Sequence, residues 1–272
     1  MSLQEEKMPK KPILYVTSSP KKMYLFSGRK FVLSFCKYLP DSDLLYMTEK
    51  FTFKIDNPNI KVEELSAYPF LLEWLNKYKY LIPKELGGTQ PKKLSFWNFK
   101  ASLWFRKVAA LHYAKAKYGD QYDNIVWVDN DCEFLQPLTD QYVLNMFHGK
   151  GVIYFLGSYR LMRDMGIESG FVGFSNTVGY AFLDRLFSYF MGGAFVNKRR
   201  WDDGYVMRLV MKKDPSVGYD LALEQEKKDL IKLKKVRKSV NVMALHGLRK
   251  FLVHRKGSHF KNKIDREKVK KK

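Results

Sequence analysis

The chain has 272 residues, of which 46% are hydrophobic and 15% aromatic, and its formal net charge is +21. That much apolar material excludes wholesale disorder, and the length suits one large α/β domain or two small ones. Its two cysteines are too few for a disulfide framework, so a reduced, cytoplasmic setting is expected. We expect neither a signal peptide nor a membrane-spanning helix, since neither pattern occurs in the sequence.

The positive charge is concentrated near the C-terminus. Residues 227–272 contain 18 basic and three acidic residues, which give +15 of the total +21. Such a field attracts polyanions, namely nucleic acid, a diphosphate substrate or the headgroups of an anionic membrane, which the protein would contact peripherally. We expect a folded domain over residues 1–260 and a basic, disordered tail over residues 261–272.

Apolar runs and turn residues predict alternating strands and helices. The predicted strands cover residues 13–17, 44–47, 125–128, 151–156, 171–174, 240–245 and 251–253. The predicted helices cover residues 22–38, 62–80, 102–118, 178–191 and 202–212, with Pro69 as a break or a restart in the second. This alternation predicts an α/β fold with a mostly parallel central sheet and helices on both faces, in which ligands bind beyond the carboxyl ends of strands.

The strand over residues 125–128 ends in two aspartates, Asp129 and Asp131, with Asn130 between them. Two carboxylates at the end of a buried strand are costly to desolvate unless a cation or hydrogen bonds compensate them. Mg²⁺ and Mn²⁺ are the usual cations, because they prefer oxygen ligands and bridge to phosphates. An Asx turn that ends the strand is the alternative, and the motif alone leaves both interpretations open.

Two further segments carry glycine or aspartate. Gly170 and Gly173 flank a strand-like core and would let a ligand approach the backbone closely, although an ordinary turn explains them equally well. Asp202 and Asp203 stand at a predicted helix start, where one acidic side chain caps the helix. The other is then available as a general base.

Basic residues and histidines complete the set of candidates. Lys107 stands beside the apolar stripe of its predicted helix, so its side chain either snorkels to solvent or reaches a buried anion. His254 follows a late strand and precedes the basic loop at residues 255–258, which makes it a candidate metal ligand beside phosphate-contacting groups. His246 follows a similar strand and competes for that role.

The order of these motifs resembles that of GT-A-fold nucleotide-sugar glycosyltransferases, especially small ones from large viruses, phages and bacteria. The motifs are Phe-Arg-Lys-Val-Ala-Ala-Leu at 105–111, Trp-Val-Asp-Asn-Asp at 127–131, Glu-Ser-Gly-Phe-Val-Gly-Phe at 168–174, Trp-Asp-Asp-Gly-Tyr-Val at 201–206 and His-Arg-Lys-Gly-Ser at 254–258. The resemblance spans residues 12–260. It implies a single GT-A domain with a Rossmann-like nucleotide-binding half and an acceptor half.

The resemblance also implies roles for individual residues. The metal ligands for Mn²⁺ or Mg²⁺ would be Asp129, Asp131 and His254. The nucleotide-sugar donor would be bound by Thr17, Ser18, Lys107, Asp129, Asn130, Lys256 and Gly257, with Thr17 and Ser18 near the base. The acceptor-side loop would contain Glu168, Gly170 and Gly173. The catalytic carboxylate would be Asp203, or its neighbour Asp202, and Arg160 and Arg163 would contact phosphate or sugar.

The implied activity is metal-dependent transfer of a sugar from a nucleoside-diphosphate sugar, by default a UDP-sugar, to a hydroxyl of a glycan, lipid-linked or protein acceptor, with inversion. A basic nucleic-acid-binding or nuclease-like protein is one alternative, disfavoured because most basic residues lie apart from the acidic motif. A sugar nucleotidyltransferase is another, disfavoured because no glycine-rich phosphate loop follows the first strand. A non-catalytic interaction module leaves the acidic motifs unexplained. No specific nucleic-acid partner is expected.

Overall fold

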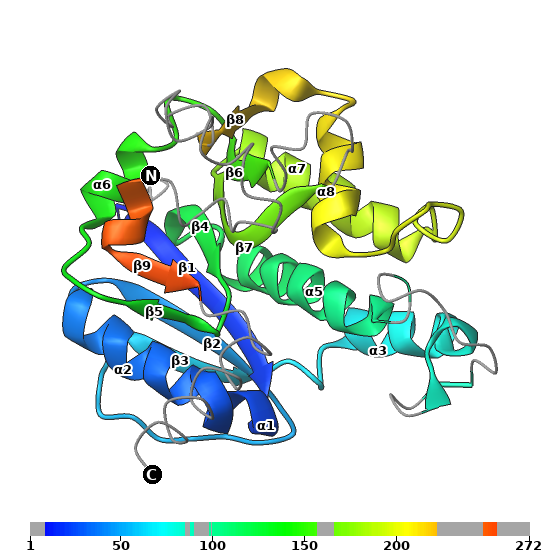
Figure 1. The fold of residues 1–272 in the computed structure, drawn as a ribbon, viewed down its shortest axis with the longest axis horizontal. Coiled ribbons are helices and arrows are strands. Elements are labelled where there is room, and N and C mark those ends of the chain that lie inside the picture. The colour runs from blue at the N-terminus through cyan, green and yellow to red at the C-terminus, as the bar shows by residue number, and fades with distance from the viewer. Residues whose placement is uncertain are drawn as a thin grey trace, which may run out of the picture.

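The computed structural model describes residues 9–84, 88–89, 98, 100–156, 166–221 and 247–254. At its centre lies a seven-stranded sheet in the order β3-β2-β1-β4-β7-β6-β8 (Figure 1). Strand β7 is antiparallel to both neighbours, and every other adjacent pair is parallel. The strands are β1 (Lys11–Pro20), β2 (Asp43–Glu49), β3 (Ile60–Glu64), β4 (Tyr122–Val128), β6 (Val152–Leu156), β7 (Ile167–Ser175) and β8 (Gly218–Asp220). A second, antiparallel sheet pairs β5 (Cys132–Phe134) with β9 (Leu252–His254).

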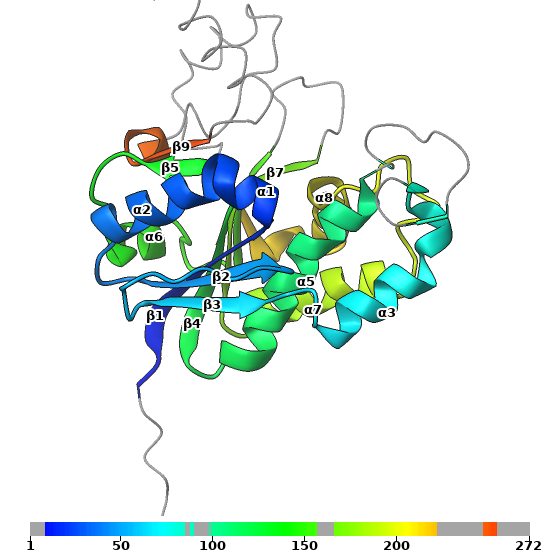
Figure 2. The same ribbon diagram turned by 90° about the horizontal axis from the view of Figure 1, so that it is seen from below.

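Helices cover both faces of the central sheet (Figures 1 and 2). One face carries α1 (Lys21–Met23), the π-helical turn η1 (Tyr24–Gly28), α2 (Arg29–Tyr38) and α6 (Asp140–Asn145). The other carries α3 (Pro69–Lys77), α5 (Ala101–Tyr118), α7 (Val178–Met191) and α8 (Asp203–Met211). Short 3₁₀ segments are η2 (Lys79–Leu81), η4 (Pro215–Val217) and η7 (Gly247–Lys250). The predicted α/β fold, with a mostly parallel sheet between two helical layers, is confirmed.

Each face of the sheet has its own hydrophobic core. Along β1, Leu14 and Val16 belong to the core under α3, α5, α7 and α8, whereas Ile13 and Tyr15 belong to the core under α2 and α6. Strands buried on both faces need apolar residues at successive positions, which explains the continuous apolar runs in the sequence. Within the described residues, no helix combines the length and the apolarity needed to cross a bilayer.

Residues 62–80 differ from the single helix predicted for them. Strand β3 ends at Glu64, and α3 begins at Pro69 after a short turn. A proline in the first turn of a helix costs no hydrogen bond, so of the two roles left open for Pro69, a break or a restart, the structure shows the start of a helix. The sequence patterns also miss β5, α6 and β8, because elements of three to six residues are too short to display a period. The strand predicted over residues 240–245 lies outside the described residues.

The glycine segment is a strand and not the loop that the resemblance implies. Glu168, Gly170 and Gly173 all lie in β7. A Cβ at Gly173 would lie 2.7 Å from side-chain carbons of both Ile153 and Phe147. Gly173 therefore lacks a side chain for a packing reason, because β6 and the segment after α6 press on that face of β7.

We predict that Gly173→Ala lowers the free energy of unfolding by about 1–3 kcal/mol, since the added methyl group overpacks a filled core. Gly192→Ala is the matched control, because Gly192 is exposed with a φ of −74° and should change stability by only about 0.5 kcal/mol. Urea denaturation measures both. Equal stabilities for the two variants would contradict this packing role.

Candidate active site

The two aspartates after β4 lie where three strands meet. The Asp129 N–H donates to the Gly170 carbonyl of β7 at 2.9 Å, and the Cys132 N–H donates to the Asp129 carbonyl at 2.9 Å. This turn directs the chain from β4 into β5, which pairs with β9 so that Cys132 stands opposite His254. The pairing places His254 Nε2 3.0 Å from Asp131 Oδ1. The predicted metal ligands therefore lie together, although His254 is far from Asp129 and Asp131 in sequence.

Lys107 of α5 is the cation of this cluster. Its side chain is 10% exposed, and its Nζ lies 2.8 Å from Asp129 Oδ1 and 3.1 Å from Asp203 Oδ2. Nζ also donates to the Ser169 carbonyl at 2.9 Å. Burial lowers the pKa of Lys107, but the charges of Asp129 and Asp203 outweigh it and raise the pKa above its ordinary value. Of the two interpretations open from sequence, the lysine that reaches a buried anion is the correct one.

Asp129 is held in its ionised form. Burial raises the pKa of Asp129, but the charges of Lys107 and His254 outweigh it and bring the pKa below its ordinary value. The Trp127 indole N–H donates to Asp129 Oδ1 at 2.6 Å. One carboxylate oxygen is thus occupied by Lys107 and Trp127, while the other faces His254 Nε2 at 3.5 Å.

His254 is surrounded by carboxylates. Its side chain is 5% exposed, and its Nδ1 lies 3.8 Å from Glu168 Oε1 of β7. Among the described residues that nitrogen makes no hydrogen bond. Burial lowers the pKa of His254, but its hydrogen bond to Asp131 and the nearby negative charges raise it overall. The site therefore has more acidic than basic groups around one imidazole, which favours a bound cation.

Asp202 and Asp203 have different partners. Asp202 accepts two hydrogen bonds from the Arg200 guanidinium, at 2.7 and 2.9 Å, and caps α8 by accepting from the Tyr205 N–H at 3.1 Å. Asp203, whose side chain is 3% exposed, faces Lys107 instead. The sequence expectation that one aspartate caps the helix is met by Asp202, and Asp203 is the one that joins the charged cluster.

The predicted nucleotide contacts lie at the carboxyl end of β1, next to β4. Thr17 is fully buried, and within the described residues its hydroxyl makes no hydrogen bond. Ser18 is half-buried. The Asn130 side chain hydrogen-bonds the Tyr46 hydroxyl, which also shares a 2.6 Å hydrogen bond with the hydroxyl of Ser19. Burial is the main reason that the pKa of Tyr46 rises to about 12.

Three site residues were not predicted from the sequence. Trp127 was visible as part of the aspartate motif, and a side chain two residues before Asp129 on a strand shares its face. Arg200 stands two residues before Asp202, and this spacing does not by itself predict an ion pair between the two side chains. Tyr46 lies in the middle of β2, which pairs with β1, and it becomes relevant only through tertiary packing. The predicted contributors His246, Lys256, Gly257, Arg160 and Arg163 lie outside the described residues.

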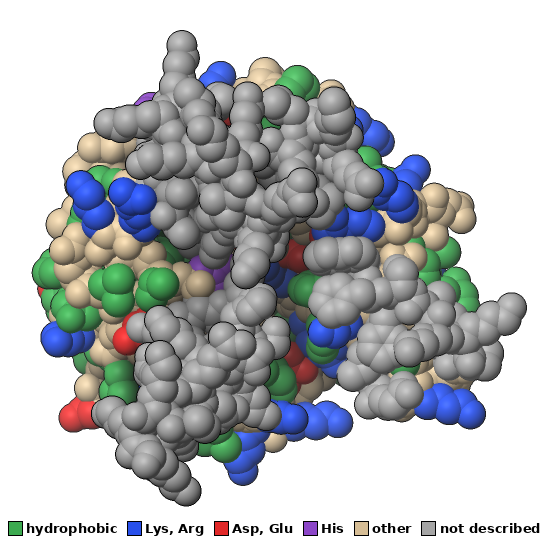
Figure 3. Space-filling view, viewed as in Figure 1, with side chains coloured by type: hydrophobic (Ala, Val, Ile, Leu, Met, Phe, Trp, Pro, Cys, Tyr) green, Lys and Arg blue, Asp and Glu red, His purple; other side chains and the backbone are tan. Residues whose placement is uncertain are grey.

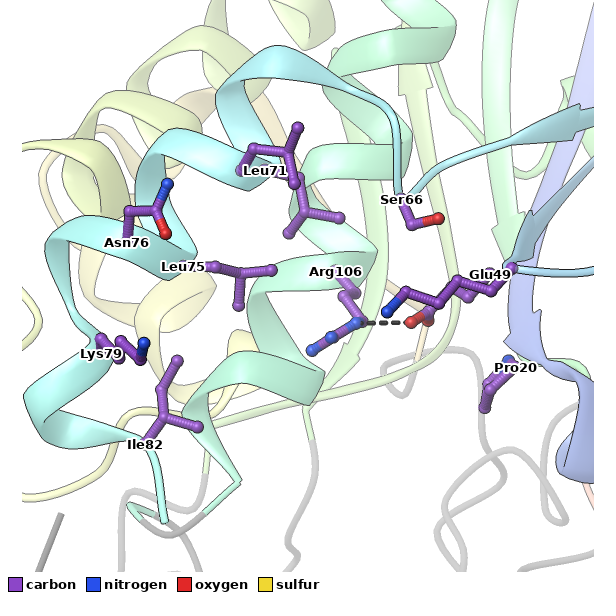
Figure 4. Close-up of a pocket in the computed structure, with 11 residues that line it drawn as sticks. Pro20, Glu49, Ser66, Leu71, Leu75, Asn76, Lys79, Ile82 and Arg106 are labelled. Atoms are coloured by element: carbon purple, nitrogen blue, oxygen red, sulfur yellow. Dashed lines mark hydrogen bonds and ion pairs between the residues drawn. The ribbon is translucent and has the colours of Figure 1, made fainter. Parts of the chain in front are cut away.

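A cavity of about 450 Å³ lies beside the cluster, between the carboxyl ends of β1 and β2 and helices α3 and α5 (Figure 4). One wall is apolar and includes Leu71, Leu75 and Ile82. The opposite wall carries the ion pair of Arg106 Nε with Glu49 Oε2, at 2.7 Å. Because Arg106 and Lys107 are adjacent on α5, the helix contributes one cation to the cavity and the next to the acidic cluster.

The donor atoms of the cluster fit a divalent cation. Ligand atoms of Asp131, Cys132 and His254 all lie within 4.8 Å of one another. Burial raises the pKa of the Cys132 thiol well above its ordinary value, so Cys132 offers a neutral sulfur, a poor ligand for a hard ion. Asp129, Asp131 and His254 are therefore the residues that could hold Mn²⁺ or Mg²⁺. Figure 3 shows a histidine and acidic side chains that reach the surface near the middle of the face seen in Figure 1.

The chain resembles solved structures in its fold but matches no family model. No curated protein matches its sequence. Among solved structures, the apo form of mouse xyloside xylosyltransferase 1 is similar, with a TM-score of 0.45 and 12% identity. The match covers 78% of this chain and 85% of that chain.

We predict that Lys107→Met lowers the free energy of unfolding by about 3 kcal/mol, because it leaves two carboxylates in a largely buried site without their cation. Adding Asp203→Asn to that variant should restore about 1 kcal/mol. The control is Lys115→Met, which breaks the more exposed ion pair with Asp184 and should cost at most about 1 kcal/mol. A Lys107 variant as stable as the Lys115 variant, in chemical denaturation, would refute the central position of this cation.

Proposed function

We propose that the chain is a metal-dependent glycosyltransferase that moves a sugar from a nucleoside-diphosphate donor to a hydroxyl acceptor. The observation that carries the proposal is the convergence of Asp129, Asp131 and His254 at the carboxyl edge of the sheet. Lys107 and Asp203 adjoin them on the other side. A cluster of this kind binds a cation and an anionic ligand together and keeps a second carboxylate close to them.

The donor diphosphate belongs at the aspartate end of the cluster. A divalent ion held by Asp129, Asp131 and His254 would supply positive charge that stabilises the departing diphosphate without protonating it. Lys107 holds one oxygen of Asp129, so the other oxygen stays directed toward His254. The lysine therefore fixes the ligand geometry and adds a permanent positive charge close to the diphosphate.

The nucleoside belongs beyond the ends of β1 and β2. The buried hydroxyl of Thr17 lacks a hydrogen-bond partner among the described residues, and a polar edge of a nucleoside would satisfy it. The cavity beside Arg106 is lined by Pro20 at the same end of β1 and has the volume of a small-molecule site. Its apolar wall suits a planar base, and its Arg106–Glu49 pair offers both hydrogen-bond donors and acceptors.

Asp203 is the proposed general base. In the reaction, the acceptor O–H gives its proton to Asp203, the acceptor oxygen bonds to C1 of the sugar, and the bond from C1 to the diphosphate oxygen breaks. The electron pair of that bond leaves on the diphosphate, and attack from the opposite face inverts C1. Asp202 is already committed to Arg200 and to the start of α8, so we assign it the role of positioning Asp203.

We predict that Asp131→Ala abolishes Mn²⁺-dependent binding of UDP, measured by isothermal titration, while the protein stays folded. Asp123→Ala is the matched control, because Asp123 is an exposed aspartate at the opposite end of β4 and its loss should leave the affinity unchanged. Unchanged UDP affinity in Asp131→Ala would defeat the metal assignment. Titrating Zn²⁺ in the same experiment tests whether Cys132 takes part, since thiolate ligands favour that ion.

We predict that Asp203→Asn lowers kcat at least about a hundredfold on whichever nucleoside-diphosphate sugar proves to be the donor, with little change in UDP affinity. Asp202→Asn should instead lower the melting temperature, because it removes the negative charge from a buried ion pair with Arg200 while keeping an oxygen that can cap α8. Release of the nucleoside diphosphate measures turnover, and NMR of the first-formed product reads the anomeric configuration. Full turnover in Asp203→Asn, or a retained configuration, would contradict the assignment of the base.

A further inference from the structure

The helical run from α1 through η1 to α2 has an outer face that combines exposed apolar and basic side chains. Leu25, Phe26 and Leu33 are exposed by 66%, 41% and 56%. Five basic residues are interspersed with these apolar residues along the helical run, and all five are exposed. They are Lys21, Lys22, Arg29, Lys30 and Lys37. Residues 21–38 contain no aspartate or glutamate. We propose that this outer face, defined by these eight residues and called here the docking face, binds the surface of an anionic membrane.

The docking face is rigidly held before any partner arrives. On the inner side of the helix, Phe31, Val32 and Phe35 are buried in the core under α2. At the π-helical turn, the Arg29 N–H donates to the Tyr24 carbonyl, and Tyr24 stacks on Phe53 with ring centroids 4.4 Å apart. The exposed leucines and phenylalanine therefore cannot turn inward, and a membrane would meet a preformed amphipathic surface.

The mixture of residue types favours a membrane over other anionic partners. A helix that lies in a membrane interface needs apolar side chains that enter the headgroup region and basic ones that attract anionic lipids. Nucleic-acid backbones need only the basic residues, and two exposed leucines would gain nothing from them. A protein partner would need compensating acidic groups for a surface whose charges are all positive. The complete absence of acidic residues from the run matches an anionic lipid surface.

The position of the docking face links it to the candidate active site. The run begins at Lys21, directly after the carboxyl end of β1. At Gly28 the helix approaches the sheet so closely that a Cβ would lie 2.2 Å from the Tyr46 hydroxyl. Tyr46 is also the hydrogen-bond partner of Ser19 and Asn130. A membrane on the docking face would thus lie close to the edge of the sheet where the acidic cluster opens, and the docking itself requires no sugar transfer.

Co-sedimentation of the full chain with vesicles tests this inference. We expect binding to phosphatidylcholine vesicles that contain phosphatidylserine, and weak binding to phosphatidylcholine alone. Leu25→Ser with Phe26→Ser should weaken binding at least about tenfold, because exposed apolar area is removed while the charge is kept. The matched control is Phe70→Ser with Leu72→Ser, a Phe and Leu pair on α3 that is exposed by 42% and 46%, which should change binding less than about twofold.

Charge-reversal variants provide a second test of membrane binding. Lys22→Glu with Arg29→Glu should abolish vesicle binding, whereas Lys198→Glu with Arg199→Glu, two exposed basic residues before α8, should preserve most of it. Equal binding by the Leu25/Phe26 variant and the wild type would overturn the proposal, and so would duplex DNA that competes fully with vesicles. If the Leu25/Phe26 variant melts well below the wild type, Leu33→Ser provides the same readout at a separate position.

Discussion

A single buried ammonium group holds this structure together at its candidate site. Lys107 joins α5 to the end of β4 through Asp129, to β7 through the Ser169 carbonyl and to the start of α8 through Asp203. The contacts with β7 and α8 join elements distant in sequence, and two of the three contacts are with carboxylates that would be costly to bury alone. The arrangement leaves Asp129 ionised, with one oxygen committed to Lys107 and the other facing His254. The geometry of the proposed metal site therefore depends on a residue that need not touch the metal.

The second sheet completes the site from the other end of the chain. Pairing of β5 with β9 brings His254 beside Asp131, and β7 contributes Glu168 on the far side of the imidazole. The α8 cap, made by Asp202 with Arg200, holds Asp203 at its start. If the protein catalyses the proposed reaction and the docking face binds a membrane, the edge of the sheet that carries the acidic cluster lies near the membrane surface. That position favours a lipid-linked acceptor over a glycan or protein acceptor.

The sequence predicts the features that depend on residues close together in the chain, such as the end of a strand or the cap of a helix. Asp129 and Asp131 were placed at the end of a strand because four apolar residues precede them, and Asp202 was placed as a cap because it opens a helix. The sequence cannot predict which anion Lys107 contacts, because its contacts with Asp129 and Asp203 form only when α5, the end of β4 and the start of α8 pack together. The sequence pattern predicts helix for β3, because the five residues of this strand run into the apolar periodicity of α3. Gly173 was interpreted as a ligand-side glycine because the packing of Ile153 and Phe147 on it is invisible in a linear sequence.

The central claim is that the acidic cluster binds a metal and a nucleoside diphosphate together. A thermal-shift experiment with nucleoside diphosphates, each with and without Mn²⁺, tests it most directly, because a ligand that binds the folded state raises the melting temperature by mass action. The account predicts that one diphosphate together with Mn²⁺, at about a hundred times its Kd, raises the melting temperature by roughly 5 °C or more, well above either component alone. If no nucleoside diphosphate raises it in the presence of Mn²⁺, while duplex DNA does, the account is contradicted.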